Sequence, residues 1–382
     1  MKLTLLGATG SIGTSTIDVM LRHRELFSAY ALVGHQNAEK MRTLAESLRP
    51  ELVIMTDPDA ALKLKGTLPS GVRLEAGMDA AIAAASEASV AMVMAAMVGS
   101  AGLPAALAAV RAGKRVGLAN KECLVSAGRI FMQAAYEYGA TVVPVDSEHA
   151  AVHQALAGHD HDSVTKITLT ASGGPFRSRD PDTLYDVTPE EAIAHPNWDM
   201  GAKISVDSAT MMNKALELIE ARWLFNMPPE KLSAIIHPQS IIHAMVEYRD
   251  GSVLAQLAEP DMRSPIAYAM QSRPRLSSGI AWLDLAKTGV LEFQKVNEER
   301  FPAMRLVRDV MRGEDSLAIV FNAANEIANQ AFRNRKIGFM KIVESVESVL
   351  SLADNLPVET IEDVWSYDRQ ARRLTEEVIA KC

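Results

Sequence analysis

Cysteine is scarce in this sequence: Cys123 and Cys382 are the only two among 382 residues. Such a chain has no disulfide framework, and we expect it to fold in a reducing cytoplasm. Positive charge is also in short supply, because the formal net charge is -8. A nucleic-acid-binding protein would carry a basic face, so we do not expect this class of protein.

Long hydrophobic runs are nearly absent. Residues 1–7 are largely apolar, but this run is too short for a signal peptide and turns directly into glycines. Residues 88–110 carry no charge and are about as many as a membrane span needs. Alanine is the most frequent residue in this stretch, and Gly99, Gly102 and Pro104 interrupt it. We therefore predict a strand, a turn and a helix here, and no membrane contact.

The amino-acid composition is typical of an ordinary soluble globular protein, with 48% hydrophobic and 23% charged residues. A chain of 382 residues is too long for one hydrophobic core, so we expect two or three domains. In the first third, short apolar runs alternate with amphipathic stretches. We predict strands at residues 2–6, 30–33, 52–55, 90–94 and 115–118, and helices at 11–22, 78–85 and 103–111. This alternation predicts a parallel, doubly wound sheet.

A glycine-rich turn directly follows the first predicted strand. It reads Gly7-Ala8-Thr9-Gly10-Ser11-Ile12-Gly13 and opens the first predicted helix. Glycines let the backbone approach a pyrophosphate, and the start of a helix supplies N–H donors and a positive dipole end. We therefore predict a dinucleotide site. A glycine turn without a ligand remains the alternative, because the spacing is G-x-x-G-x-x-G and not the commoner G-x-G-x-x-G.

The end of the second predicted strand bears on the choice of cofactor. An NAD enzyme normally places Asp or Glu there to bind the ribose hydroxyls. Here the residues are Gly34-His35-Gln36-Asn37, without a carboxylate. A 2′-phosphate would be tolerated at this strand end, so the sequence favours NADP over NAD.

Two carboxylates follow a further apolar run at residues 141–143: Asp146 and Glu148. On a strand, side chains two residues apart face the same way. Converging carboxylates repel each other unless a cation lies between them, and Mg²⁺ or Mn²⁺ accepts oxygen ligands of this kind. We predict a metal site. The alternative is a solvated strand-to-helix turn capped by Ser147 or Asp146.

Polar residues gather at three more places. Lys121 and Glu122 follow the strand at 115–118, where they are either site residues or a surface ion pair. Residues 171–176 form a small-residue turn suited to a phosphate. A helix predicted from residue 203 carries Asn213, Lys214 and Glu217 on one side. Lys214 and Glu217 are either a surface helix pair or a cation and a third metal-binding carboxylate.

Seven motifs together resemble the 1-deoxy-D-xylulose 5-phosphate reductoisomerase family, and the similarity spans the whole chain in order. The motifs are residues 7–13, 119–122, 145–149, 172–176, 195–198, 211–214 and 237–240. The resemblance implies conversion of 1-deoxy-D-xylulose 5-phosphate and NADPH to 2-C-methyl-D-erythritol 4-phosphate, with Mg²⁺, Mn²⁺ or Co²⁺, in the non-mevalonate route to isoprenoid precursors.

The resemblance also implies roles for individual residues. The metal ligands would be Asp146, Glu148 and Glu217. The substrate would be held, largely by its phosphate, by Ser147, Ser172, His195, Ser208, Asn213 and Lys214, with Lys121 near its reacting end. NADPH would contact Thr9, Gly10, Ser11, Ile12, Asn37, Asn120, Glu122 and Gly201. Gln36 stands where many family members have a basic residue facing the 2′-phosphate, so it brings hydrogen bonds but no charge.

The family resemblance further implies a division of the chain. Residues 1–146 would form a Rossmann-like NADPH domain, and 147–278 an α+β catalytic domain with a flexible flap at 172–202 and the homodimer contact. Residues 279–300 would be a linker, and 301–382 a C-terminal four-helix bundle. We expect a phosphorylated small-molecule substrate, no nucleic acid and no membrane partner. The alternatives are an NADP-dependent sugar-phosphate dehydrogenase without skeletal rearrangement and a regulator that binds NADPH without turnover.

Overall fold

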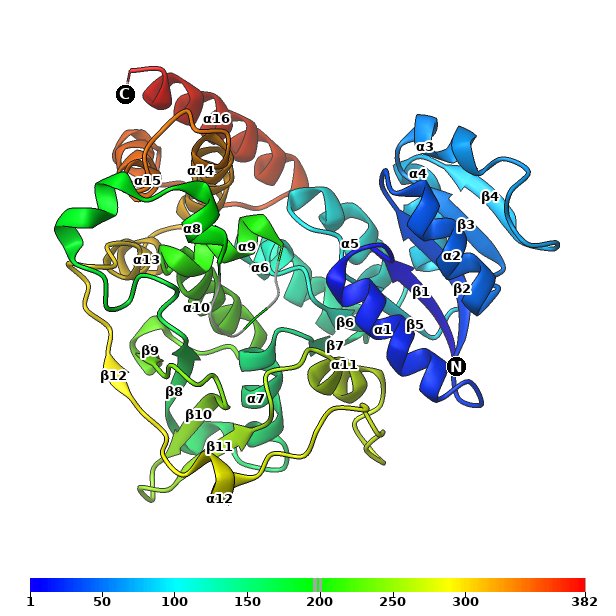
Figure 1. Ribbon diagram of the computed structural model, residues 1–382, viewed down its shortest axis with the longest axis horizontal. Helices are drawn as coiled ribbons and strands as arrows, with labels where there is room; N and C mark the ends of the chain where they lie inside the picture. Colours follow the sequence, from blue (N-terminus) through cyan, green and yellow to red (C-terminus); the bar gives the residue numbers. More distant parts are fainter. Residues whose placement is uncertain (195–197, 199–200, 382) are drawn as a thin grey trace. The chain divides into compact units, whose positions relative to one another are not determined.

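A computed structural model describes residues 1–194, 198 and 201–381 (Figure 1). The chain divides into two compact units, each built from separate stretches of sequence. Unit 1 comprises Met1–Cys123, Phe131–His153 and Asp261–Ala281, and unit 2 comprises Leu124–Ile130, Gln154–Pro260 and Trp282–Cys382. The finer division into four parts stays a prediction.

Unit 1 contains a seven-stranded parallel sheet in the order β4-β3-β2-β1-β5-β6-β7. Its strands are β1 (Lys2–Leu6), β2 (Ser28–Gly34), β3 (Leu52–Met55), β4 (Arg73–Ala76), β5 (Met92–Ala95), β6 (Arg115–Leu118) and β7 (Thr141–Pro144). The predicted parallel, doubly wound sheet is confirmed. Strand order reverses between β1 and β5, and ligands of such sheets bind outside the carboxyl ends of the strands near this point.

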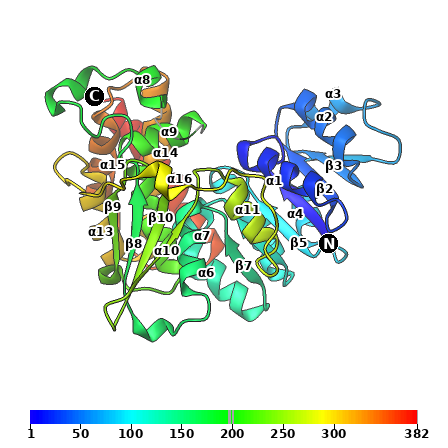
Figure 2. The same cartoon turned by 60° about the horizontal axis from the view of Figure 1, so that its bottom comes forward.

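The helices of unit 1 alternate with these strands. They are α1 (Ser11–Arg22), α2 (Ala38–Leu48), α3 (Pro58–Leu64), α4 (Met78–Ser86), η1 (Ser100–Gly102), α5 (Leu103–Arg111) and α11 (Arg263–Met270). Helix α11 comes from a distant part of the sequence. It packs against α1, β6 and β7 (Figure 2). Its residues Ile266 and Met270 lie in the core of the unit.

The uncharged stretch at residues 88–110 forms β5 and α5, as predicted. Within the described residues, none of the helices combines the length and the apolar character that a membrane crossing requires.

Unit 2 contains a mixed five-stranded sheet in the order β11-β10-β8-β9-β12. Its strands are β8 (Val164–Ala171), β9 (Leu232–Ile236), β10 (Ile242–Tyr248), β11 (Val253–Leu257) and β12 (Gln294–Lys295). Strands β8 and β9 are parallel, whereas β10 pairs antiparallel with both β8 and β11. The helical elements before and within this region are α6 (Glu122–Glu137), α7 (Ser147–Leu156), η2 (His161–Ser163), η3 (Pro181–Asp186), α8 (Pro189–Ile193), η4 (Pro229–Lys231) and α12 (Leu285–Thr288).

The single helix predicted from residue 203 is wrong, because the structure has two helices there. Helix α9 (Ala202–Ala209) ends before α10 (Met212–Leu224) begins. Met211 lies between them with a φ of 61°, and Thr210 Oγ1 accepts a hydrogen bond from the Met212 backbone at 3.3 Å. A left-handed methionine carries no sequence signal, since glycine or asparagine usually fills that conformation.

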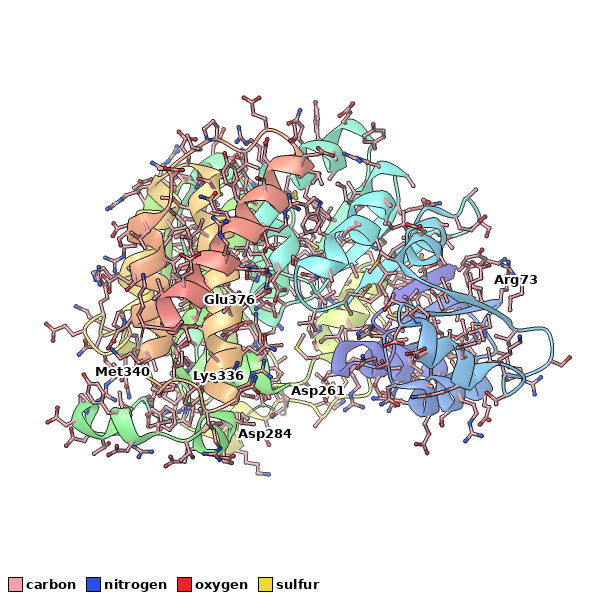
Figure 3. All side chains as sticks on the ribbon, turned by 90° about the horizontal axis from the view of Figure 1, so that it is seen from above. Arg73, Asp261, Asp284, Lys336, Met340 and Glu376 are labelled. Atoms are coloured by element: carbon pink, nitrogen blue, oxygen red, sulfur yellow. The ribbon has the colours of Figure 1, made fainter. Side chains whose placement is uncertain are left out.

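The C-terminal part consists of α13 (Ala303–Arg312), α14 (Asp315–Arg333), α15 (Lys341–Leu352) and α16 (Ile361–Ile379). The long helix α14 packs against each of the other three. Figure 3 shows α14, α15 and α16 side by side with their side chains, and labels Glu376 on α16.

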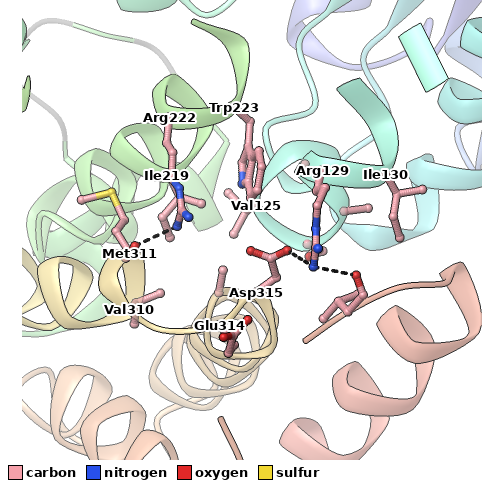
Figure 4. Close-up of a pocket in the computed structure, with 15 residues that line it drawn as sticks. Val125, Arg129, Ile130, Ile219, Arg222, Trp223, Val310, Met311, Glu314 and Asp315 are labelled. Atoms are coloured by element: carbon pink, nitrogen blue, oxygen red, sulfur yellow. Dashed lines mark hydrogen bonds and ion pairs between the residues drawn. The ribbon is translucent and has the colours of Figure 1, made fainter. Parts of the chain in front are cut away.

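Helix α6 is kinked at Ala127, and its segment 124–130 packs within unit 2 (Figure 4). The indole of Trp223 lies so close to Gly128 that a Cβ there would be 2.2 Å from its ring. Beside it, Arg129 forms an ion pair with Asp315 at 2.7 Å and donates to the Val358 carbonyl at 2.9 Å. This segment therefore contacts both α10 and α14. Helix α10 carries the predicted site residues Asn213, Lys214 and Glu217.

Candidate active site

The glycine turn lies at the carboxyl end of β1. Gly7 has a φ of +86°, and a Cβ on it would be 2.3 Å from the Ala96 carbonyl oxygen. A Cβ on Gly13 would be 2.4 Å from the Gly7 carbonyl oxygen. Gly10 caps α1 without a side-chain hydrogen bond. The turn therefore needs its glycines sterically and leaves the N–H groups of the first helical turn to an anionic ligand.

The ends of β2 and β3 lie next to each other, since Gly34 pairs with Met55 in the sheet. Asn37 Oδ1 accepts from the Lys40 backbone at 3.0 Å and so caps α2. Gln36 Nε2 donates to Asp57 Oδ2 at 3.1 Å. Asp57 follows β3, so its pairing with Gln36 depends on the register of β2 and β3. Neighbouring parallel strands end at the same edge, so the first acidic residue after β3 was the available signal.

Lys121 and Asp146 follow the neighbouring strands β6 and β7. The Lys121 ammonium lies 2.5 Å from Asp146 Oδ2. This contact is an ion pair without hydrogen-bond geometry, since the buried Asp146 Oδ2 makes no hydrogen bond. Lys121 and Glu122 are both buried, so they are not a surface ion pair. Asn120 Nδ2 donates to the Gly99 carbonyl at 2.9 Å and fixes the end of β6 to the loop after β5.

The strand geometry expected for Asp146 and Glu148 is wrong. Strand β7 ends at Pro144 and α7 begins at Ser147, so the two carboxylates lie in a turn and in the first turn of a helix. The Asp146 carbonyl accepts the first helical hydrogen bond, from Ala150, at 2.8 Å. Ser147 Oγ donates to Glu148 Oε2 at 2.6 Å. Both carboxylates lie near the positive end of the α7 dipole.

Glu217 on α10 is almost fully buried, with 1% of its surface exposed. Asn213 Nδ2 donates to Glu217 Oε1 at 2.5 Å, and the Lys214 ammonium donates to Glu217 Oε2. Lys214 is also buried. The interpretation as a surface helix pair is therefore wrong. Burial of a carboxylate is tolerated because each oxygen has a donor.

The small-residue turn after β8 also has the expected character. Ser172 Oγ accepts from the Gly174 backbone at 3.1 Å, and Gly173 and Gly174 have φ values of +81° and +67°. Gly201 directly precedes α9, and Ser208 lies on that helix. The Trp198 and His243 rings have centroids 6.3 Å apart. His195 lies outside the described residues.

A buried polar cluster joins α9 to α14, and no local sequence pattern predicts a role for its asparagines. Asp207 Oδ1 accepts from Asn325 Nδ2 at 2.9 Å and from Asn329 Nδ2 at 2.8 Å. Lys203 Nζ lies 3.1 Å from Asp207 Oδ2. Asp207 directly precedes Ser208. The cluster therefore fixes the helix that carries a predicted phosphate-binding serine.

A glycine turn at the switch point of a parallel sheet, with buried carboxylates and lysines at its neighbouring strand ends, defines a dinucleotide-dependent α/β oxidoreductase. Family models match most of the chain: "1-deoxy-D-xylulose 5-phosphate reductoisomerase" at residues 3–128, its C-terminal domain at 142–225, and "DXP reductoisomerase C-terminal domain" at 257–374. The chain belongs to the 1-deoxy-D-xylulose 5-phosphate reductoisomerase family.

Similar proteins agree with this assignment. The reductoisomerase of Paraburkholderia xenovorans (strain LB400) is 51% identical over 385 residues, covering 100% of this chain and 96% of its own length. That of Ralstonia pickettii (strain 12J) is 50% identical and covers 100% and 98%. The solved structure of the Zymomonas mobilis enzyme in complex with NADPH has a TM-score of 0.93 at 44% identity, covering 99% and 98%. A reductoisomerase structure with NADPH, fosmidomycin and magnesium has a TM-score of 0.93 at 38% identity, covering 100% and 98%.

Replacement of Asp207 by Ala tests the buried cluster. The change removes the acceptor shared by Asn325 and Asn329 and the carboxylate that Lys203 contacts. We expect the free energy of unfolding, from urea titration, to fall by about 3 kcal/mol or more, as when one partner of a buried ion pair is lost. In the control Glu377→Ala, which breaks an exposed pair with Arg373, we expect a loss below about 1 kcal/mol. Equal small losses in both variants would contradict a structural role for Asp207.

Proposed function

We propose that the chain catalyses the NADPH- and divalent-metal-dependent isomerisation and reduction of 1-deoxy-D-xylulose 5-phosphate to 2-C-methyl-D-erythritol 4-phosphate. The observation that carries the proposal is the buried group on α10, where Lys214 and Asn213 hold the Glu217 carboxylate. The proposed metal ligand Glu217 thus lies on α10 within about one helical turn of Asn213 and Lys214, whose side chains suit a phosphate. The relatives named above, with their NADPH and magnesium complexes, support the same reaction.

The divalent cation would be held by Asp146, Glu148 and Glu217, one of two sets of side chains whose ligand types suit a metal ion. Asp146 Oδ2 lies 2.5 Å from the Lys121 ammonium, so this carboxylate is already placed against a positive charge. A second group, Asp146 with His149 and Glu220, shares this residue. Mg²⁺ and Mn²⁺ prefer carboxylate oxygen over imidazole nitrogen, and this favours the first group.

The residues of the chain have separate tasks in this reaction. The bound metal supplies Lewis-acid chemistry at the substrate carbonyl and a neighbouring hydroxyl. Lys214, Asn213, Ser208 and the Ser172 turn bind the phosphate, and this remote binding energy orients the reacting carbons. Lys121 lies near the reacting end. The skeleton would rearrange by carbon–carbon cleavage and rejoining to a branched aldehyde, and NADPH would supply the hydride for its reduction.

The cofactor would be held by the residues predicted above. The pyrophosphate binds at the glycine turn and the N-terminus of α1, beside Thr9, Gly10, Ser11 and Ile12. The described residues 172–194, 198, 201 and 202 would belong to a flap that excludes water from the reacting groups. The left-handed Gly173 and Gly174 at one end of this segment support a hinge.

We also infer that the protein acts in the cytoplasm as a homodimer. The segment after Ala281 exposes large apolar side chains: Trp282 is 97% exposed and Val290 68%. Exposed apolar surface of this kind marks an interface. We expect light scattering to give the mass of two chains, and Trp282→Asp to shift the protein toward one chain. A monomeric wild-type chain at micromolar concentration would contradict the dimer.

A direct assay tests the reaction. We expect loss of NADPH absorbance when 1-deoxy-D-xylulose 5-phosphate is added with Mg²⁺, Mn²⁺ or Co²⁺, no loss after chelation with EDTA, and recovery when metal is restored. Analysis of the carbon skeleton by NMR distinguishes the branched product from the unbranched product of a simple dehydrogenase. NADPH binding without metal-dependent oxidation would favour a regulator instead.

Glu217→Gln tests the metal assignment. The amide keeps the shape of the side chain but removes its negative charge, so we expect kcat to fall by roughly a hundredfold or more. The dissociation constant of NADPH should stay within a few-fold, because Glu217 is not among the predicted cofactor-binding residues. The matched variant is Glu220→Gln, from the second group. Full activity of Glu217→Gln together with an inactive Glu220→Gln would assign the metal to that group.

A further inference from the structure

The turn at residues 172–176, where the substrate phosphate is expected, depends on contacts at its two ends. Gly173 and Gly174 have φ values of +81° and +67°, and glycines resist bending of the backbone less than other residues do. At the start of the turn, the His237 backbone donates to the Ala171 carbonyl at 2.7 Å and continues the pairing of β8 with β9. The start is therefore fixed by the sheet.

The other end of the turn is fixed by an arginine from a distant part of the sequence. Arg300 Nη1 donates to the Phe176 carbonyl at 2.7 Å. A hydrogen bond from a charged donor is stronger than one between neutral groups. The Phe176 side chain is buried, and its ring packs edge-on against Phe339 with the centroids 5.2 Å apart.

The turn lies directly against the end of α9. A Cβ on Gly174 would be 2.8 Å from the Ser208 carbonyl oxygen and 2.9 Å from Ala209 Cα. Ser172 Oγ accepts from the Gly174 backbone at 3.1 Å. Ser172 and Ser208, two serines expected at the phosphate, thus lie on segments in contact with each other. A displacement of the turn would change the spacing between their hydroxyl groups.

A cavity of about 110 Å³ adjoins these two segments. Its lining includes Phe176, Ala209, Arg300, Phe339 and Val343. Side chains beside a cavity have fewer packing contacts on that side to hold them in place. The Arg300 hydrogen bond is directed, so it holds the end of the turn where packing leaves room for movement.

We propose that Arg300 is a positioning residue for the substrate phosphate, because its hydrogen bond to the Phe176 carbonyl fixes the spacing of Ser172 and Ser208. The proposal rests on the proposed function, since it assumes that these serines bind the phosphate of 1-deoxy-D-xylulose 5-phosphate. Arg300 acts through the turn, so its loss weakens binding of the phosphate and leaves binding of NADPH unchanged.

The substitution that isolates this contact is Arg300→Met, which keeps a long side chain but removes the donor. The matched control is Arg222→Met. Arg222 Nη1 also donates to a backbone carbonyl, that of Met311, at 2.8 Å, and this hydrogen bond is likewise partly buried. Arg300→Lys keeps a donor on a shorter side chain. It provides a graded variant and keeps the test usable if Arg300→Met does not fold.

The experiment measures KM and kcat for 1-deoxy-D-xylulose 5-phosphate, the inhibition constant of inorganic phosphate and the dissociation constant of NADPH, for the full chain and the three variants. We expect Arg300→Met to raise both KM and the inhibition constant by about tenfold or more, because small displacements of binding groups have effects of this size. We expect kcat to fall less than about threefold and the NADPH constant to stay within about twofold. Arg300→Lys should give intermediate values.

The control separates positioning from a general loss of stability. We expect urea titration to show similar losses for Arg222→Met and Arg300→Met, since each removes one arginine hydrogen bond to a carbonyl. Arg222→Met should change KM and the phosphate inhibition constant less than about twofold.

Two results overturn the proposal in distinguishable ways. If the wild-type chain is active but the Arg300 variants keep its KM, or if Arg222→Met raises KM as much as Arg300→Met, Arg300 does not position the phosphate and the proposed reaction is unaffected. If the wild-type chain does not convert 1-deoxy-D-xylulose 5-phosphate with NADPH and metal, the proposed function fails and the role of Arg300 fails with it.

Discussion

Burial of the Glu217 carboxylate is the constraint on which the site in unit 2 depends. An ionised carboxylate removed from water costs several kcal/mol unless donors replace its hydration. Asn213 and Lys214 supply one donor to each oxygen and leave lone pairs for a cation. Both donors lie in the first turn of α10. This helix begins separately from α9 because Met211 between them has a left-handed conformation. The positive end of the α10 dipole then adds to the charge of Lys214 where a phosphate is expected.

The same logic explains the polar residues inside α14. A helix packed against three neighbours should be apolar on its buried side, yet Asn325 and Asn329 are fully buried. Their amides satisfy Asp207 on α9, so the cost of burying each polar group is offset by the other. An apolar contact would allow α9 to slide or rotate, whereas directed hydrogen bonds hold it in one position. Helix α14 of the C-terminal part thereby holds α9 through directed hydrogen bonds.

Local patterns allowed much of this molecule to be predicted. Alternating apolar runs predicted the parallel sheet, and Gly7 to Gly13 predicted the turn after β1, because both signals lie within a few residues. The signals that failed depend on tertiary structure. Nothing local marks Met211 as left-handed, and the pairing of Gln36 with Asp57 requires the register of β2 and β3. The strand geometry expected for Asp146 and Glu148 failed because α7 begins immediately after β7, and a helix start can follow a strand without a glycine or proline.

The parallel topology of unit 1 itself explains why so many charged side chains meet at one edge. Every strand of the sheet runs in the same direction, so the residues after β1, β2, β3, β6 and β7 emerge on the same side. The sheet interior is apolar, and charged groups can be placed only where a strand ends. The glycine turn after β1 lies in the middle of this edge and carries no charge. Asp57 follows β3 on one side of it, and the Lys121–Asp146 pair follows β6 and β7 on the other side. A nucleotide bound across the switch point therefore meets different charges at its two ends, and the strand order decides which end meets which.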